Sequence, residues 1–521
     1  MKKKIIKSVI IILAAVVVIG CLLGFVITPE TASPSNGAVD GIKPFSSASE
    51  IGSNYYRIPA VITAADGTLV ASADARFGGT KDSANNIDTA VSLSNDGGES
   101  WSEPTLALSF DDWENSSKIL KENGSLGTKN SASLIDTALL QDKNTGRIFM
   151  LVDAFPYATG VSNSQQGSGY DEIDGQKRLL LKKDGDKDYN YYVDENGVIC
   201  SKDGKETEYS LNSKYEVLEN SQPLTVKQKE LKYWYNFSFG VNTKTEVPMN
   251  IMYKNSLFKP LPTSYLYLVY SDDSGKTWSD PVDLNQFVKP EDECFMGVCP
   301  GRGIQIENGE YAGRLIFAAY FYDTETFKQR FTTIYSDDGG KTWQAGEGVT
   351  PNETIGNFSE TQLVQFKDGS LQSFSRTTVG KVASSISLDG GVTWSSPAAV
   401  DELPLTGGSG CQLSVINYEG KIDGKDAVVL SAPAMDERKN GFVYVGLISE
   451  IKDPQKPYNI EWKYRTEITD KDTYFAYSCL TQLENGSIGL LYEQANTPQT
   501  VDTMIFKTYT ISELCKTEYK K

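Results

Sequence analysis

Polar side chains recur at a nearly constant distance before predicted hairpin turns. Four of them lie nine or ten residues ahead of a turn glycine: Arg57, Asp136, Glu360 and Tyr477. Two arginines follow such turns, Arg76 nine residues after Gly67 and Arg376 seven residues after Gly369. If the hairpins are equivalent, these side chains meet around one cavity, where acids and tyrosine can do acid–base or nucleophilic chemistry. The alternative is that they are ordinary solvated strand ends.

The composition limits which chemistry this cavity can support. The 521 residues include no histidine, which excludes Ser–His and Cys–His nucleophile pairs and zinc sites that need imidazole. Carboxylates and tyrosines therefore become the natural acid–base candidates. The net charge of −18 argues against a nucleic-acid partner.

The elements that must position these residues are β-strands. Short runs rich in β-branched and aromatic residues alternate with turn residues along most of the chain. A phrase of the form S-x-D-x-G-x-[ST]-W occurs four times, and the last three of its tryptophans are 65 and 51 residues apart, a spacing typical of propeller blades. The four phrases end at Trp101, Trp278, Trp343 and Trp394.

We interpret each phrase as a structural turn. Its aspartate would cap backbone amides, its glycine would take a positive φ, and its tryptophan would pack underneath. A calcium loop is the competing interpretation, but no glutamate stands at the twelfth position. Asp338, in the third phrase, is therefore not a predicted catalyst.

The N-terminal residues are typical of a targeting segment. Four lysines precede an apolar run over residues 9–27, and this run is about long enough to cross a bilayer. We expect residues 1–27 to be a membrane anchor, with a cleaved signal peptide or a lipobox at Cys21 as open alternatives. Residues 28–53 form a predicted linker.

Beyond the linker we predict an all-β propeller over residues 54–156 and 254–515. It is interrupted by a small β-rich insertion at residues 157–253, where the aspartate phrase is missing.

Together these motifs resemble the bacterial exo-sialidases of glycoside hydrolase family 33. The four phrases look like that family's Asp boxes, and NYYRIP at residues 54–59 resembles its F/Y-R-I-P motif. The resemblance extends over residues 54–509 and implies a six-bladed β-propeller. The remaining motifs follow in the family's order: DARFGGTKDSANNIDTA, SASLIDTALL, GRGIQI, SETQ, SFSRTT, CQLSVINY, RKNG and YSCLT.

The resemblance implies roles for the substrate-binding residues. Arg57, Arg376 and Arg438 match three arginines that hold the substrate carboxylate, to which a planar guanidinium offers two parallel donors. Three further residues match positions around the sugar, namely Arg76 and Asp136 on its 4-hydroxyl and N-acetyl side and Tyr320 as an aromatic wall.

The resemblance also implies the catalytic residues. Asp82 matches the general acid/base, Tyr477 the nucleophile and Glu360 its partner. Sialidases use tyrosine where most glycosidases use a carboxylate. The carboxylate beside the anomeric carbon would repel an anionic nucleophile, whereas a neutral phenol avoids this repulsion.

The expected activity is that of an exo-α-sialidase acting on sialylated glycans, glycoproteins and glycolipids outside the cell, as a monomer. No cofactor or metal is required, and a structural calcium ion stays an open alternative. Gly410 departs from close hydrolytic relatives, which carry an aromatic residue there, so the product is open. The alternatives are an intramolecular trans-sialidase that releases a 2,7-anhydro sugar and an inactive sialoglycan-binding propeller.

Overall fold

The computed structural model describes residues 41–53, 55–77, 79–110, 114–115, 131–234, 237–404, 408–495 and 503–519. The predicted anchor at residues 1–27 lies outside these ranges, as do residues 28–40 of the predicted linker. Over the ranges given, the helices are too short or too polar to cross a bilayer. Strands make up nearly all of the regular structure, and α2 (Asn285–Val288) and α3 (Ile511–Leu514) have one turn each.

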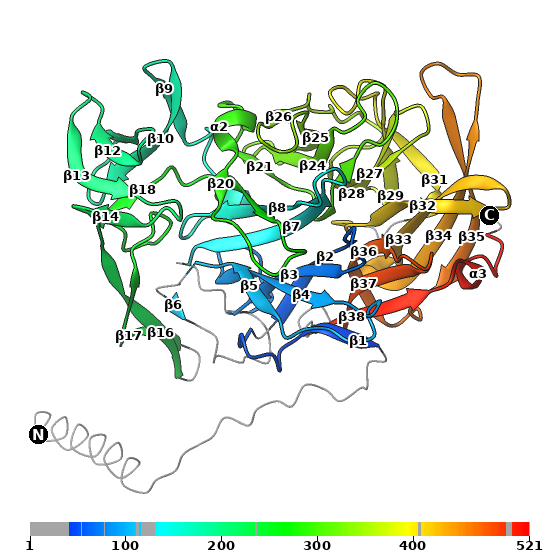
Figure 1. Ribbon diagram of the computed structural model, residues 1–521, viewed down its shortest axis with the longest axis horizontal. Helices are drawn as coiled ribbons and strands as arrows, with labels where there is room; N and C mark the ends of the chain where they lie inside the picture. Colours follow the sequence, from blue (N-terminus) through cyan, green and yellow to red (C-terminus); the bar gives the residue numbers. More distant parts are fainter. Residues whose placement is uncertain are drawn as a thin grey trace, which may run out of the picture. The chain divides into compact units, whose positions relative to one another are not determined.

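The short strands of the propeller region (Figure 1) form four hydrogen-bonded sheets in the described residues. Antiparallel pairing divides these sheets into six strand groups, because only the parallel pair of Ile87 with Ser133 joins the first two groups and only the pair of Lys439 with Tyr474 joins the last two. The first group is β2 (Tyr55–Thr63) to β5 (Thr105–Leu108), and the second is β7 (Ser133–Gln141) and β8 (Ile148–Phe155) with β19 (Tyr265–Ser271) and β20 (Val282–Asp283). The third is β21 (Phe295–Val298) with β23 (Ile304–Gln305) to β26 (Gln344–Ala345), whereas β22 (Gly301–Arg302) pairs in parallel with β7. The other three are β27 (Phe358–Gln365) to β31 (Ala398–Pro404), β32 (Ser414–Ile422) to β35 (Tyr458–Glu467), and β36 (Tyr474–Gln482) to β38 (Thr503–Tyr509) with β1 (Ile42–Ser46). Such meanders are the blades of a β-propeller, so the predicted all-β fold is confirmed.

The sixth group joins the two ends of the described chain. Strand β1 pairs with β38, with Ile42 opposite Phe506 and Phe45 opposite Met504. Phe45 is fully buried in this sheet. The N-terminal strand therefore completes a blade whose other strands come from the C-terminal end.

Side-chain amides join neighbouring groups near their hairpin turns. In each case the side-chain oxygen accepts a backbone N–H from the preceding group, at 2.7–3.0 Å. The acceptors are Gln141, Gln305, Gln365, Asn417 and Gln482. These repeated bonds satisfy backbone groups between the blades and fix one end of each first strand.

The aspartate phrases form the expected turns. Asp338 accepts the backbone N–H and the hydroxyl of Thr342 at 2.9 and 2.7 Å. Trp343 is buried and packs against Phe149 with ring centroids 5.8 Å apart. Pairing of Ser336 with Leu315 places this turn at the end of its hairpin opposite Tyr320. The structural interpretation of the phrase is thus confirmed.

Residues in the predicted insertion form a sheet of their own, beside β19 and β20 (Figure 1). Its path runs from β10 (Gln176–Lys183) through β11 (Tyr191–Val193), β12 (Val198–Ser201), β13 (Glu206–Leu211) and β14 (Val217–Glu219) to β15 (Gln222–Pro223), with β9 (Tyr170–Ile173) and β18 (Phe258–Lys259) paired to β10. A long hairpin of β16 (Thr225–Trp234) and β17 (Phe237–Pro248) follows. Tyr215 stacks on Tyr267 of β19, and the Tyr170 hydroxyl donates to Asp283 of β20 at 2.8 Å.

Candidate active site

Four first strands carry a β-bulge at the end away from the hairpin turn. The pairing register slips at or beside one predicted site residue in each: Arg57 in β2, Asp136 in β7, Glu360 in β27 and Tyr477 in β36. A bulge adds an unpaired residue and re-aims its side chain. Asp136 and Ile58, the neighbour of Arg57, both have φ near +61°, an uncommon backbone conformation that clusters at functional sites.

Tyr477 and Glu360 form a hydrogen-bonded pair. The Tyr477 hydroxyl donates to the Glu360 carboxylate at 2.5 Å, although the two residues are 117 positions apart. Arg376 lies on β28 (Leu371–Thr377). Its Nη1 donates to both partners, at 2.7 Å to Glu360 and at 2.9 Å to the Tyr477 oxygen. Burial raises the pKa of Tyr477 well above its usual value, even though the Arg376 charge lowers it. The resting hydroxyl is therefore a neutral phenol beside a proton acceptor.

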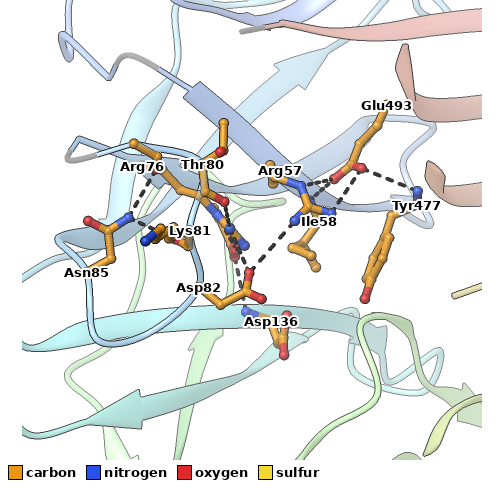
Figure 2. Close-up of polar contacts among 12 residues, drawn as sticks. Arg57, Ile58, Arg76, Thr80, Lys81, Asp82, Asn85, Asp136, Tyr477 and Glu493 are labelled. Atoms are coloured by element: carbon orange, nitrogen blue, oxygen red, sulfur yellow. Dashed lines mark hydrogen bonds and ion pairs between the residues drawn. The ribbon is translucent and has the colours of Figure 1, made fainter. Parts of the chain in front are cut away.

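Arg57 connects Tyr477 with Asp82 (Figure 2). Its guanidinium carbon lies 5.3 Å from the centre of the Tyr477 ring, and one Nη lies 3.8 Å from an Asp82 oxygen. Its other nitrogens form a bidentate ion pair with Glu493 on β37 (Ile488–Ala495), at 3.1 and 3.2 Å. Glu493 also accepts the N–H of Ile58 at 2.9 Å, so one buried carboxylate holds both the arginine and the strained residue beside it.

Asp82 lies on the loop between β3 (Leu69–Arg76) and β4 (Ile87–Ser94), and its side chain is 65% exposed. Arg76, at the end of β3, is fully buried and donates to Asp82 at 2.8 Å and to Asp74 at 2.7 Å. Partial enclosure acts to raise the pKa of Asp82, but the charges of Arg76 and Arg57 outweigh it and lower that pKa. The charges of the two arginines therefore keep Asp82 as a carboxylate.

Arg438 approaches the Tyr477 ring from the connection between β33 (Lys425–Met435) and β34 (Lys439–Glu450). Its guanidinium carbon also lies 5.3 Å from the ring centre, and its Nε donates to the Gly410 carbonyl at 3.3 Å. The Ser409 carbonyl accepts two bonds from Arg376, at 2.9 and 2.7 Å. Two successive carbonyls therefore orient two of the three arginines.

Gly410 has a φ of +68°, and a Cβ built there would lie 2.1 Å from the Thr377 carbonyl oxygen. In this backbone conformation, a side chain at 410 would collide with the end of β28. The glycine is what lets the carbonyls of Ser409 and Gly410 reach the arginines.

Asp136 and Tyr320 complete the predicted set. Asp136 is 8% exposed, and its backbone N–H donates to Asp74 at 3.1 Å. Burial and the Asp74 carboxyl raise the pKa of Asp136 well above its usual value. Tyr320, on β24 (Leu315–Tyr322), packs against Phe295 with centroids 5.1 Å apart, and burial followed by the Asp136 charge raises the pKa of Tyr320. The contacts and electrostatic couplings link all nine predicted residues.

Two buried carboxylates of the site were missed by the sequence reasoning. Glu493 holds Arg57, and Asp74 holds Arg76. A signal for both was present, because each lies seven residues after a turn glycine, the same offset that singled out Arg376. Both acids lie on the second strand of their groups, where each pairs with an arginine of the site.

The arrangement can bind an anion and transfer protons on two sides of it. Three guanidinium groups surround Tyr477, Glu360 can accept the phenolic proton, and Asp82 offers a second carboxyl group at the exposed edge. These are the parts needed for nucleophilic attack with general acid assistance.

Comparisons with a family model and with known proteins agree on one family. Residues 218–490 match the model of a BNR repeat-like domain. The chain is 42% identical over 484 residues to an anhydrosialidase of Macrobdella decora, covering 89% of this chain and 61% of that protein. It is 38% identical over 456 residues to sialidase B of Streptococcus pneumoniae serotype 4, covering 86% of this chain and 63% of that protein. The chain therefore spans a little over three fifths of each of these two relatives.

A solved structure agrees over nearly its whole length. The intramolecular trans-sialidase from Ruminococcus gnavus superposes with a TM-score of 0.86 at 39% identity, covering 92% of this chain and 99% of that one. The strand groups, the Asp-box turns and the similarity over the whole propeller lead to one conclusion: this chain belongs to the sialidase family.

Proposed function

We propose that this chain is an exo-α-sialidase that removes terminal sialic acid from glycans, glycoproteins and glycolipids. The observation that carries the proposal is the Tyr477 hydroxyl, bonded to Glu360 and enclosed by Arg57, Arg376 and Arg438. Such a set is suited to a sugar whose reacting carbon bears a carboxylate, since three fixed cations bind that carboxylate and a neutral nucleophile is not repelled by it.

The first step forms a covalent intermediate. The Tyr477 oxygen attacks the anomeric carbon, and its proton passes to Glu360 across their hydrogen bond. Asp82, in its protonated form, gives a proton to the glycosidic oxygen as the bond to the leaving alcohol breaks. Arg376 stabilises the negative charge that grows on the Tyr477 and Glu360 oxygens.

The second step releases the sugar. Asp82 is now a carboxylate and removes a proton from a water molecule that attacks the anomeric carbon. The bond to Tyr477 breaks, and Glu360 returns the proton to the phenolate. Asp82, Glu360 and Tyr477 end in their starting protonation states.

Substituting the nucleophile tests this proposal. Tyr477→Phe keeps the ring between the arginines but removes the attacking oxygen, so cleavage of 3′-sialyllactose should fall by at least ~100-fold. Binding of free sialic acid should remain, because the arginines are intact. Undiminished cleavage by Tyr477→Phe would contradict the nucleophile assignment. If the unmodified protein binds the sugar but does not cleave the substrate, the inactive sialoglycan-binding propeller is the better description.

A second candidate function differs only in what attacks the intermediate. An intramolecular trans-sialidase uses the sugar's own 7-hydroxyl instead of water and releases the 2,7-anhydro sugar. Two of the similar proteins are named for this kind of reaction, at 42% and 39% identity. Mass spectrometry of the released sugar separates the two functions, because the anhydro product is lighter by one water.

We further propose that the protein acts outside the cell as a monomer, anchored through residues 1–27 or secreted after their cleavage. The length and charge pattern of that segment support this placement. The proposed propeller at 54–156 and 254–515 would hold the active site, with 157–253 as the insertion.

A further inference from the structure

The loop between β3 and β4 must hold an exposed catalytic group in place. Asp82 has a side chain that is 65% exposed, and it lies on a connection rather than on a strand. A displacement of about 1 Å in a reacting group can cost on the order of 100-fold in rate. The features that fix this loop are therefore part of the catalytic design.

Arg76 holds one side of the loop. Its Nη1 donates to the Thr80 carbonyl at 2.6 Å and to the Asp82 carboxylate at 2.8 Å (Figure 2). These contacts fix Asp82 through its own carboxylate and through the backbone two residues earlier.

Asn85 holds the other side of the loop through backbone carbonyls (Figure 2). Its side chain is fully buried, and its Nδ2 donates to the carbonyls of Gly79 and Lys81 at 3.0 and 2.8 Å. Its Oδ1 accepts the N–H of Asn86 at 2.9 Å. One carboxamide thus joins three backbone groups of the loop, including the residue just before Asp82.

Asn85 is itself tied to a rigid strand. The Ser133 hydroxyl on β7 donates to the Asn85 carbonyl at 2.6 Å and accepts the Asn85 N–H at 3.2 Å. Strand β7 also carries Asp136, which the proposed function places against the sugar. The same strand therefore anchors the loop of Asp82 and carries Asp136.

We propose that Asn85 is a positioning residue for the general acid: it holds the loop so that Asp82 meets the glycosidic oxygen. This inference rests on the proposed function, because it assigns Asp82 a proton-transfer role. A carboxamide is required because it offers two N–H donors and one acceptor on a short side chain. Aspartate keeps the size and the acceptor but loses both donors, and alanine loses all three bonds.

The proposal predicts a dependence on the leaving group. An alkyl alcohol such as lactose needs a proton from Asp82 to leave, whereas 4-methylumbelliferone, a far more acidic phenol, leaves with little help. Asn85→Ala and Asn85→Asp should lower kcat/KM for 3′-sialyllactose by about 30- to 100-fold. Both should change kcat/KM for the 4-methylumbelliferyl sialoside by less than about threefold.

Asn285 provides a matched control. It is also buried, its Nδ2 donates to the carbonyls of Ser168 and Ser264 at 2.9 and 2.8 Å, and its Oδ1 accepts the Leu266 N–H at 3.1 Å. Asn285→Ala removes the same three bonds beside the insertion. It should lower the melting temperature without changing the ratio of the two kcat/KM values.

Asp82→Asn separates failure of this inference from failure of the proposed function. If that variant cleaves both substrates as well as the unmodified protein does, the proposed role of Asp82 is wrong. If it shows the leaving-group dependence and neither Asn85 variant does, Asn85 has no positioning role. Activity on the aryl substrate reports folding of the same preparation. An equal loss on both substrates in both Asn85 variants would mean that Asn85 is only structural, and would overturn the proposal.

Discussion

At the scale of single residues, the site is a set of charges that constrain one another. Burial keeps the Tyr477 phenol neutral, while Arg376 lies close enough to stabilise the oxygen once its proton has moved to Glu360. Asp82 is held as a carboxylate by the charges of Arg76 and Arg57. In the proposed reaction, each group is prepared for a step that begins when an anionic sugar binds and offsets these charges.

Glu493 should control substrate binding through Arg57. Glu493→Gln keeps the size but removes the charge of a buried bidentate pair, so Arg57 loses its anchor and Ile58 its charged acceptor. We expect KM for 3′-sialyllactose to rise by about tenfold or more, as steady-state kinetics would show. Asp337→Asn is the control, because Asp337 forms a similar bidentate pair with Arg314 beside an Asp-box turn. An unchanged KM in Glu493→Gln would contradict the anchoring role.

The lowered pKa of Asp82 predicts a shift between two pH profiles. In the free enzyme the proton is lost at low pH, because Arg76 and Arg57 favour the carboxylate despite partial enclosure. A bound substrate carboxylate neutralises part of this charge and raises the pKa of Asp82. The alkaline limb of kcat should therefore lie at higher pH than that of kcat/KM, which reports the free enzyme.

Rates with 3′-sialyllactose across the pH range test this shift, and Asp82→Asn should abolish it. Coinciding limbs would show that the arginine charges do not set the protonation of Asp82. The lowered pKa of Asp82 also makes the free energy of unfolding depend on pH. The ionised Asp82 stabilises the fold above its unfolded pKa, and this contribution is lost as the pH falls through the lowered folded value.

At the scale of elements, stability and chemistry lie at opposite ends of the strand groups that form the site. The side-chain amides and the Asp-box turns lie toward the hairpin end, whereas four bulges lie at the other end and aim Arg57, Asp136, Glu360 and Tyr477 inward. The loop at 408–410 contributes backbone rather than side chains, through two carbonyls that orient arginines.

A methyl group at position 410 should disturb this loop. Gly410→Ala brings a Cβ to 2.1 Å from the Thr377 carbonyl at a φ of +68°, so the loop must move and release Arg376 and Arg438. We expect kcat/KM for 3′-sialyllactose to fall by about tenfold or more. Gly408→Ala is the matched control, since Gly408 has a φ of +66° but open space around its Cβ. Equal effects of the two substitutions would assign the loss to backbone strain alone.

At the scale of the whole described molecule, the fold depends on joining its two chain ends. Strand β1 lies outside the sequence motifs of the propeller, yet it pairs with β38 and buries Phe45 completely. Without it, β38 would be an exposed sheet edge.

Removing β1 should therefore destabilise the protein. A chain starting at residue 47 should unfold with a free energy lower by about 3 kcal/mol or more than a chain starting at residue 41, because a buried aromatic side chain and a strand ladder are lost. Chemical denaturation of the two chains measures the difference. Equal stability would mean that β1 does not close the last blade.

The fold class and part of the predicted site follow from local patterns in the sequence. The repeated aspartate phrase and the hairpin counts depend on local turn chemistry, which a sequence encodes directly. They placed Arg57, Asp136, Glu360 and Tyr477 at equivalent positions before their contacts were known. Asp82 and Arg438 came from the family resemblance alone, because loop residues have no periodic signal.

The contacts that hold these residues in place depend on the tertiary structure. The partners Glu493 and Asp74, the carbonyls of Ser409 and Gly410, and the carboxamide of Asn85 lie on other strands or on irregular loops. Their contacts depend on bulges, on φ values near +60° and on the closing of the strand groups. Such features minimise the energy of the whole assembly and are not a property of any short stretch of sequence.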